Sequence, residues 1–216
     1  MIFFKRTFFY LLTISVFIAC NNEQPKPEPV AADDTPVVIN NKQVRRPEDR
    51  VNAYAEVDVS PMDMSYYPPK YPQLKMSDPS MEPPVMRVIY SRPHLQGRKL
   101  FPDILKYGEP WRLGANEATE LQVFKTVTVG AHKLSPGRYT LHCIPAETEW
   151  AIIFNSAVDV WGLKFDEKKD LFRINIPVTH ENISIEYFTA VFEKADGGAN
   201  LVMHWGDLVA KLPFRF

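Results

Sequence analysis

The sequence predicts an all-β protein, with a single antiparallel β-sandwich or jelly-roll-like domain over residues 85–216. Three observations support this prediction. Short segments alternate apolar and polar residues with the two-residue period of a strand. Turn signals that contain glycine or proline separate these segments. Only LFPDILKYG and VDVWGLKFDEKKD have room for a helical turn or two. About eight short strands in succession are typical of a sandwich.

The strand signals are clearest in four segments. GRYTLHC (137–143), LFRINIPV (171–178) and ANLVMHW (199–205) alternate, so each predicts one buried face. EWAIIFN (149–155) is almost wholly apolar, which predicts a central strand.

Three segments carry turn signals. Ser135-Pro136-Gly137 predicts a tight turn within one hairpin, because proline followed by glycine suits a type II turn. EKADGGAN predicts a longer hairpin loop. Gly206 and Asp207 fit a two-residue type II′ turn, because glycine stands first.

Residues 1–20 are interpreted as a lipoprotein signal peptide. Lys5 and Arg6 precede an apolar run that is too short to span a membrane core of ~30 Å. The run ends in FIAC, which resembles a bacterial lipobox, although Phe17 stands where leucine is usual. The resemblance implies cleavage before Cys20, acylation of that cysteine, and an exported protein held on a membrane, facing the periplasm or the cell surface. The alternatives are an ordinary signal peptide or an uncleaved anchor.

Two further segments precede the domain. Residues 21–57 are rich in Pro, Asp, Glu, Asn and Gln, which predicts a flexible tether because such a segment buries too little apolar surface to order itself. Residues 58–84 include SPMDMSYYPPKYPQLK, whose methionines and tyrosines are unusual for a solvated linker. They predict an ordered, extended strap across the domain, with more tether as the alternative.

Composition excludes several classes of function. The net charge is −1, so the chain lacks the basic footprint of a nucleic-acid-binding protein. The chain has 2 cysteines, Cys20 and Cys143. If Cys20 carries lipid, the mature protein has no internal disulfide, and Cys143 lies on an apolar face that predicts a buried, inert thiol. No second long apolar run predicts a transmembrane helix.

The candidate site lies in a long connection, residues 90–119, in which strand signals pause. Loops of this length are often functional. The connection contains many polar residues: Arg92, His94, Arg98, Lys99, Asp103, Arg112, Asn116 and Glu117. A ligand-binding hypothesis uses Arg92, Trp111, Arg112, Asn116 and Glu117. Arg112 would hold a small polar, anionic or sugar ligand, because a guanidinium binds carboxylate or phosphate with two donors. Trp111 would stack on the ligand, while Asn116 and Glu117 would orient it.

The same residues also fit a structural network. In this alternative Glu117 pairs with Arg112, Gly114 lets the chain turn sharply, and Asn116 bonds its own backbone. The network would then pin the connection to the sheet without binding any ligand.

No metal and no cofactor is expected. The sequence has no HExxH and no paired CxxC. His132 and His142 fall on the hairpin predicted around Ser135-Pro136-Gly137. If Ser135 pairs with Arg138, their rings lie on opposite faces and cannot share an ion, whereas a one-residue register shift would place them on the same face. Trp150, Trp161 and Trp205 are interpreted as core or sheet-covering residues.

Five segments carry a resemblance to a known family. They are YSRPHLQGRKLF, YGEPWRLGANEATEL, LSPGRYTLHCIP, EWAIIFN and the pair Trp161-Gly162. Their order and spacing resemble an uncharacterised family of exported bacterial proteins, the domain of unknown function 2911. The resemblance extends from about residue 60 to the C-terminus and implies a β-rich sandwich. It implies no catalytic residue, and His142 departs from the aromatic or aliphatic residue expected there.

The leading hypothesis is a non-enzymatic binding or envelope-associated module. One alternative is a hydrolase of glycan or envelope material with Glu117 as acid/base, although no G-x-S-x-G elbow is present. Another is a purely structural surface protein.

Overall fold

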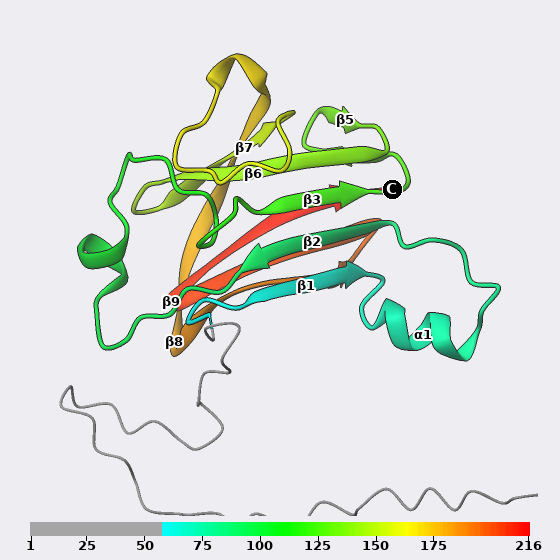
Figure 1. Cartoon of the computed structure of the whole chain (residues 1–216), viewed down its shortest axis with the longest axis horizontal. Coiled ribbons are helices and arrows are strands. Elements are labelled where there is room, and N and C mark those ends of the chain that lie inside the picture. The colour runs from blue at the N-terminus through cyan, green and yellow to red at the C-terminus, as the bar shows by residue number, and fades with distance from the viewer. Residues whose placement is uncertain (1–57) are drawn as a thin grey trace, which may run out of the picture. The chain divides into compact units, whose positions relative to one another are not determined.

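A computed structural model describes residues 58–216 (Figure 1). The predicted signal peptide, the lipidation of Cys20 and the tether of residues 21–57 lie outside the described residues. No helix within residues 58–216 has the length and apolar character needed to cross a membrane.

Nine strands form one antiparallel sheet in the order β1-β2-β3-β6-β7-β8-β9-β4-β5. The all-β prediction is confirmed. The strands are β1 (Met62–Tyr67), β2 (Met86–Ser91), β3 (Glu120–Val123), β4 (Val127–Val129), β5 (His132–Leu134), β6 (Gly137–Pro145), β7 (Glu149–Asn155), β8 (Asp170–Ala195) and β9 (Gly198–Arg215). The helical elements are α1 (Tyr71–Ser77) and two short turns, η2 (Leu100–Ile104) and η3 (Glu167–Lys169), and both turns fall in the segments predicted to hold them.

The sheet has two layers because β8 is long enough to belong to both. Its first residues, 170–177, pair with β7, and residues 178–195 pair with β9. β8 and β9 then run behind β1, β2 and β3 (Figure 1). Side chains fill the space between, with the rings of Tyr90 and Phe188 packed edge to face at 5.7 Å. The sheet therefore folds back on itself along β8, and the core lies between its two layers.

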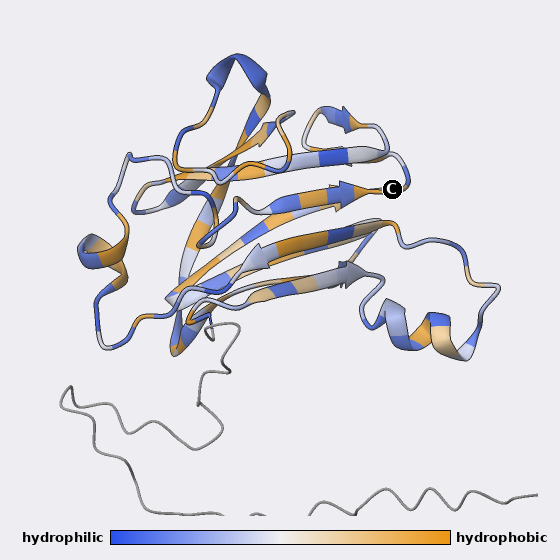
Figure 2. Cartoon of the chain, in the orientation of Figure 1, coloured by the Kyte–Doolittle hydropathy of each residue, from blue (hydrophilic) through white to orange (hydrophobic). Residues whose placement is uncertain are grey.

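Burial follows the predicted alternation in β9, and the hydropathy of the residues also changes along the long strands (Figure 2). In β9, Leu201, Met203 and Trp205 are buried, whereas Val202 and His204 are half-buried. The central position predicted for residues 149–155 is confirmed, because β7 lies between β6 and β8.

One strand is buried on both faces, which alternation did not predict. In β6, Thr140 and His142 are buried although they point away from Leu141 and Cys143. Residues 156–169 cover this second face. The Thr140 hydroxyl donates to the carbonyl oxygen of Ala157 at 2.5 Å. We call this segment, residues 156–169, the covering loop. It also supplies Phe165, whose ring stacks on His142 with the ring centres 3.9 Å apart.

The segment before residue 85 is partly regular. β1 pairs with β2 and forms one edge of the sheet, and Tyr67 donates its hydroxyl to the carbonyl oxygen of Gly198 at 3.3 Å. The helix α1 follows, with a proline in its first turn. The sequence predicted an extended strap here and did not predict the helix.

The three turn predictions need correction. β5 pairs with β4, and β6 pairs with β3 and β7, so the turn at residues 135–137 joins strands that are not neighbours. The loop between β8 and β9 has only two residues, because Ala195 pairs with Gly198. Gly206, with φ of 60°, lies inside β9 where the pairing register shifts, not in a turn.

Candidate functional site

The long connection between β2 and β3 is pinned to the sheet at two points. His94 bridges to Tyr187 of β8, and Trp111 bridges to Cys143 of β6. The second bridge consists of two backbone hydrogen bonds of 2.7 Å each between Trp111 and Cys143. The connection is therefore an ordered part of the domain, as expected of a long loop in a compact fold.

Trp111 belongs to an aromatic core. Its side chain is 8% exposed, and its ring lies 5.7 Å from Trp150, 5.7 Å from Trp205 and 5.0 Å from Phe188. Its indole N–H donates to the carbonyl oxygen of Gly114 at 3.0 Å. Little of the ring is left for stacking on a ligand, so Trp111 forms the wall of a site and not a platform.

The turn after Trp111 is built differently from the predicted one. Gly114 does not adopt a positive φ; Leu113 and Asn116 do, at 52° and 55°. A Cβ on Gly114 would lie 3.0 Å from the backbone oxygen of Ser91, so glycine is needed there for close approach.

Asn116 does not bond its own turn. Its side-chain amide donates to the Asp58 carboxylate at 2.6 Å and to the carbonyl oxygen of Ser60 at 3.4 Å. It therefore ties the connection to the residues that precede β1.

The side chain of Arg112 contacts the covering loop and does not contact Glu117. Its Nη1 donates to the carbonyl oxygen of Trp161 at 3.4 Å, and its guanidinium lies 5.9 Å from the centre of the Trp161 ring. Within the described residues, no carboxylate lies within 4.0 Å of this guanidinium. Burial lowers the pKa of Arg112, and the charge of Glu117 partly opposes this shift. The predicted Arg112–Glu117 ion pair is therefore wrong. The prediction for Trp161 also needs correction, because it is 54% exposed.

Arg92 is a structural tie in a different part of the fold. It forms an ion pair with Asp63 of β1 at 3.3 Å and donates to the hydroxyl of Thr189 at 3.3 Å. Its guanidinium also lies 5.7 Å from the Tyr187 ring. These contacts join β1 to β8 and leave Arg92 outside the cleft described below.

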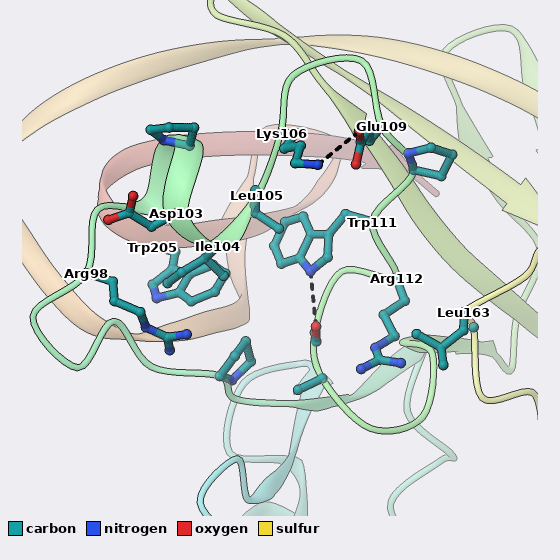
Figure 3. A pocket seen from close by; sticks show the side chains of 16 residues that line it. Arg98, Asp103, Ile104, Leu105, Lys106, Glu109, Trp111, Arg112, Leu163 and Trp205 are labelled. Atoms are coloured by element: carbon teal, nitrogen blue, oxygen red, sulfur yellow. Dashed lines mark hydrogen bonds and ion pairs between the residues drawn. The ribbon is translucent and has the colours of Figure 1, made fainter.

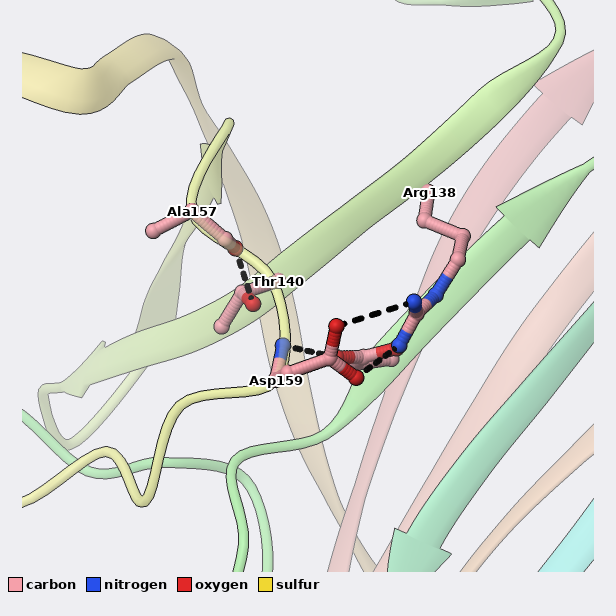
Figure 4. Close-up of polar contacts among 5 residues, drawn as sticks. Arg138, Thr140, Ala157 and Asp159 are labelled. Atoms are coloured by element: carbon pink, nitrogen blue, oxygen red, sulfur yellow. Dashed lines mark hydrogen bonds and ion pairs between the residues drawn. The ribbon is translucent and has the colours of Figure 1, made fainter.

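Glu117 lines a small cavity of about 230 Å³ together with Glu120, Asp159 and Arg138. Arg138 bridges the other two carboxylates, with ion pairs of 2.5 Å to Glu120 and 2.5 Å to Asp159 (Figure 4). The hydrogen bond from Arg138 lowers the pKa of Asp159, and the two carboxylates raise the pKa of Arg138.

A larger cleft of about 430 Å³ opens beside Trp111 (Figure 3). Arg98 and Arg112 extend into it from opposite sides. Its lining residues come from the long connection, from the covering loop and from β9: Pro93, Arg98, Pro102, Asp103, Ile104, Leu105, Lys106, Glu109, Pro110, Trp111, Arg112, Gly114, Ala115, Gly162, Leu163 and Trp205.

The structure therefore separates the five predicted site residues. Trp111 and Arg112 line the larger cleft, and Glu117 lines the smaller cavity. Arg92 and Asn116 line neither and hold segments together. Arg98 also lines the larger cleft, although nothing in its local sequence pattern distinguishes it from a solvated arginine.

The free cysteine and two histidines pack within the fold. Cys143 is buried, as predicted, and burial raises the pKa of its thiol well above the usual range. His132 stacks on Phe172 at 4.2 Å, and His142 stacks on Phe165. Across residues 58–216, no cluster of three or more His, Cys, Asp or Glu side chains has the arrangement of a metal site.

Comparison with known proteins identifies the family. No curated protein and no solved structure matches the chain significantly. The family described as "Protein of unknown function (DUF2911)" matches residues 73–214. The match begins inside α1 and includes strands β2 to β8 in full, with β9 as far as Phe214. It includes every lining residue of the larger cleft and all those of the smaller cavity except Met62. The chain therefore belongs to the DUF2911 family.

Proposed function

We propose that this protein is an exported, lipid-anchored binding module whose larger cleft binds a small ligand through an anionic group. One observation carries the proposal. Arg98 and Arg112 line opposite sides of the same cleft, and neither has a carboxylate partner within residues 58–216. Guanidinium groups bind carboxylates and phosphates with paired hydrogen bonds, so both arginines are suited to an anionic ligand.

The other charged groups of the cleft are already occupied. Lys106 and Glu109 form an ion pair with each other at 3.5 Å. A carboxylate oxygen of Asp103 accepts the backbone N–H of Lys99 at 2.8 Å. The two guanidinium groups are the cations without a carboxylate partner in this described cleft.

The surroundings of Arg112 favour an anion. Burial lowers its pKa, which means that its charged form loses hydration in the cleft. A bound anion would replace that hydration with charge-assisted hydrogen bonds. The volume of about 430 Å³ lies within the range of small-molecule sites.

The membrane anchor is supported by the sequence. The FIAC motif supports lipidation of Cys20, and the composition of residues 21–57 supports a tether. A Cys20→Ala variant is expected to lose the acyl modification, which mass spectrometry of the full-length chain's processed product would detect. An unchanged acyl mass would contradict the anchor.

A hydrolase that uses Glu117 is less well supported. A glycosidase needs a carboxylic acid whose pKa is raised, next to a second carboxylate. The two carboxylates that share the cavity of Glu117 both bind Arg138, which lowers the pKa of Asp159. This favours structural ion pairs over acid catalysis.

The binding proposal is tested with the full-length chain in a mild detergent. Thermal unfolding is followed with inorganic phosphate or acetate as the probe, for the wild type, Arg98→Gln and Arg112→Gln. Arg173→Gln is the matched control, because Arg173 is exposed on β8 and lines neither cavity.

We expect at least one anion to raise the unfolding temperature of the wild type and the control, and to raise it less in both cleft variants. The proposal fails if neither anion stabilises the wild type. It also fails if the cleft variants respond like the wild type.

A further inference from the structure

We propose that the ligand is a small dianion that carries two separated anionic groups, one for each arginine. This proposal rests on the proposed function and adds the class of ligand. Arg98 and Arg112 point into the cleft from opposite sides, with the wall formed by Trp111 between them (Figure 3). A single carboxylate on one arginine would leave the other without an anionic partner.

Each guanidinium is held in position by its own surroundings. Arg98 donates from Nε to the carbonyl oxygen of Leu95 and from Nη2 to that of His94, both at 2.9 Å. Arg112 is held by the carbonyl oxygen and the ring of Trp161. These contacts orient the two cations before any ligand binds, which lowers the entropy cost of binding.

Both arginines keep donors for a ligand. A guanidinium has five N–H donors. Within the described residues, Nη1 of Arg98 makes no hydrogen bond, and neither Nε nor Nη2 of Arg112 makes one. The carbonyl contacts therefore orient the groups without using up their capacity to bind carboxylate.

The space between the arginines suits an apolar body. The indole N–H of Trp111 is already bonded to Gly114, so that ring offers no donor to a ligand. Leu105 also lines the cleft, and Leu163, which is 73% exposed, offers the most accessible apolar surface of these lining residues. A short hydrocarbon chain with a carboxylate at each end matches this order of cation, apolar wall and cation.

One acidic side chain of the cleft disfavours a highly charged ligand. Asp103 lines the cleft without a cationic side-chain partner in the described residues, whereas Glu109 is paired with Lys106. A ligand with further negative groups would be repelled by the Asp103 carboxylate, because like charges disfavour each other. The cleft therefore favours a dicarboxylate over a polyphosphate.

The test is a titration series on the full-length chain in a mild detergent, measured by calorimetry. The probes are succinate, glutarate, adipate and pimelate, each compared with the monocarboxylate of the same carbon number. We expect one dicarboxylate to bind at least about tenfold more tightly than its monocarboxylate partner, because it gains a second guanidinium–carboxylate contact. We expect Arg98→Gln and Arg112→Gln each to remove most of that difference, and Arg173→Gln to retain it.

The outcomes separate this inference from the proposed function. If monocarboxylates bind as tightly as dicarboxylates and both arginines still matter, the cleft binds anions but the dianion inference is overturned. If no probe binds and phosphate and acetate also fail to stabilise the wild type, both proposals are overturned. Arg98 is exposed and contacts only backbone carbonyls, so Arg98→Gln keeps the test decisive if Arg112→Gln does not fold.

Discussion

The guanidinium of Arg112 lies 5.9 Å from the centre of the Trp161 ring, and its Nη1 donates to the carbonyl oxygen of the same residue. The two residues belong to different segments, Arg112 to the long connection and Trp161 to the covering loop. Their contact therefore joins the two segments that border the larger cleft. The adjacent Gly162 leaves room for Arg112, because a Cβ at position 162 would lie only 3.0 Å from Cβ of Arg112.

Arg112 and Glu117 are expected to contribute to stability independently. Arg112→Met, Glu117→Gln and the double variant form a cycle measured by urea unfolding. Because no ion pair within 4.0 Å joins the two described side chains, the free-energy changes should add to within about 0.5 kcal/mol.

Arg138→Met with Glu120→Gln is the comparison cycle, since those side chains pair at 2.5 Å. A coupling as large for Arg112–Glu117 as for Arg138–Glu120 would contradict the prediction and restore the structural network.

Gly162→Ala is expected to destabilise the domain and weaken anion binding. Gly162 has a φ of 81°, and a Cβ would lie 2.7 Å from Cβ of Ala118. The backbone strain and the clash together should lower the free energy of unfolding by about 1–3 kcal/mol.

Gly97→Ala isolates the backbone contribution, because its φ is 73° but a Cβ there meets nothing within 4 Å. Urea unfolding of both variants measures the difference. An equal loss at the two positions would argue against tight packing at Gly162.

Asn116→Ala is expected to loosen the residues before β1. The variant loses the hydrogen bonds to Asp58 and Ser60, which should cost about 1–2 kcal/mol. It also places alanine at a φ of 55°. Asn116→Gly removes the same bonds but tolerates that φ, so it separates the two effects.

Hydrogen exchange of the β1 amides measures the loosening. Faster exchange in both variants is the expected result. Exchange that is unchanged in Asn116→Gly would mean that the bonds to Asp58 and Ser60 do not hold this segment.

Stability is expected to fall below neutral pH because of His142. Burial lowers its pKa from 6.5; the Asp170 carboxylate opposes this shift, and Arg173 supports it. The unfolded chain therefore binds a proton more readily than the folded one. The stabilising contribution is fully present above pH 6.5 and is lost as the pH falls from there toward the lowered pKa.

Urea unfolding between pH 8 and pH 5 tests this, with His142→Phe as the variant and His132→Phe as the control. Phenylalanine would keep the contact with Phe165 and remove the titrating group. The free energy of unfolding should fall less steeply with decreasing pH in His142→Phe than in the wild type, and as steeply as in the wild type in the His132→Phe control. Equal slopes in all three proteins would exclude His142 as the source.

The buried faces of the long strands could be predicted because alternation is a local property. In residues 199–205, the alternate side chains of Leu201, Met203 and Trp205 face the core, as the pattern predicts. Strand pairing could not be predicted in this way. The turn at residues 135–137 has good local chemistry, but the two strands that it joins do not pair with each other: β5 pairs with β4, and β6 pairs with β3 and β7. The covering loop buries His142, so the sequence pattern of β6 alone could not predict that this side chain is buried.

The site was predicted only in part for a similar reason. The pause in strand signals located the long connection, and Arg112 does line the cleft. Sequence proximity suggested Glu117 as its partner, but the backbone directs the two side chains to different cavities. Leu163 reaches the cleft only through the covering loop, and its distance from Arg112 along the chain conceals the relation.

The position of β9 has a consequence for when the cleft can form. This strand lies inside the sheet between β8 and β4, and its Trp205 packs on Trp111 of the long connection. Until β9 joins the sheet, Trp111 lacks that ring and residues 178–195 of β8 lack their antiparallel partner strand. Contacts between segments so distant in sequence form slowly. The cleft is therefore expected to assemble late in folding, after β9 has paired.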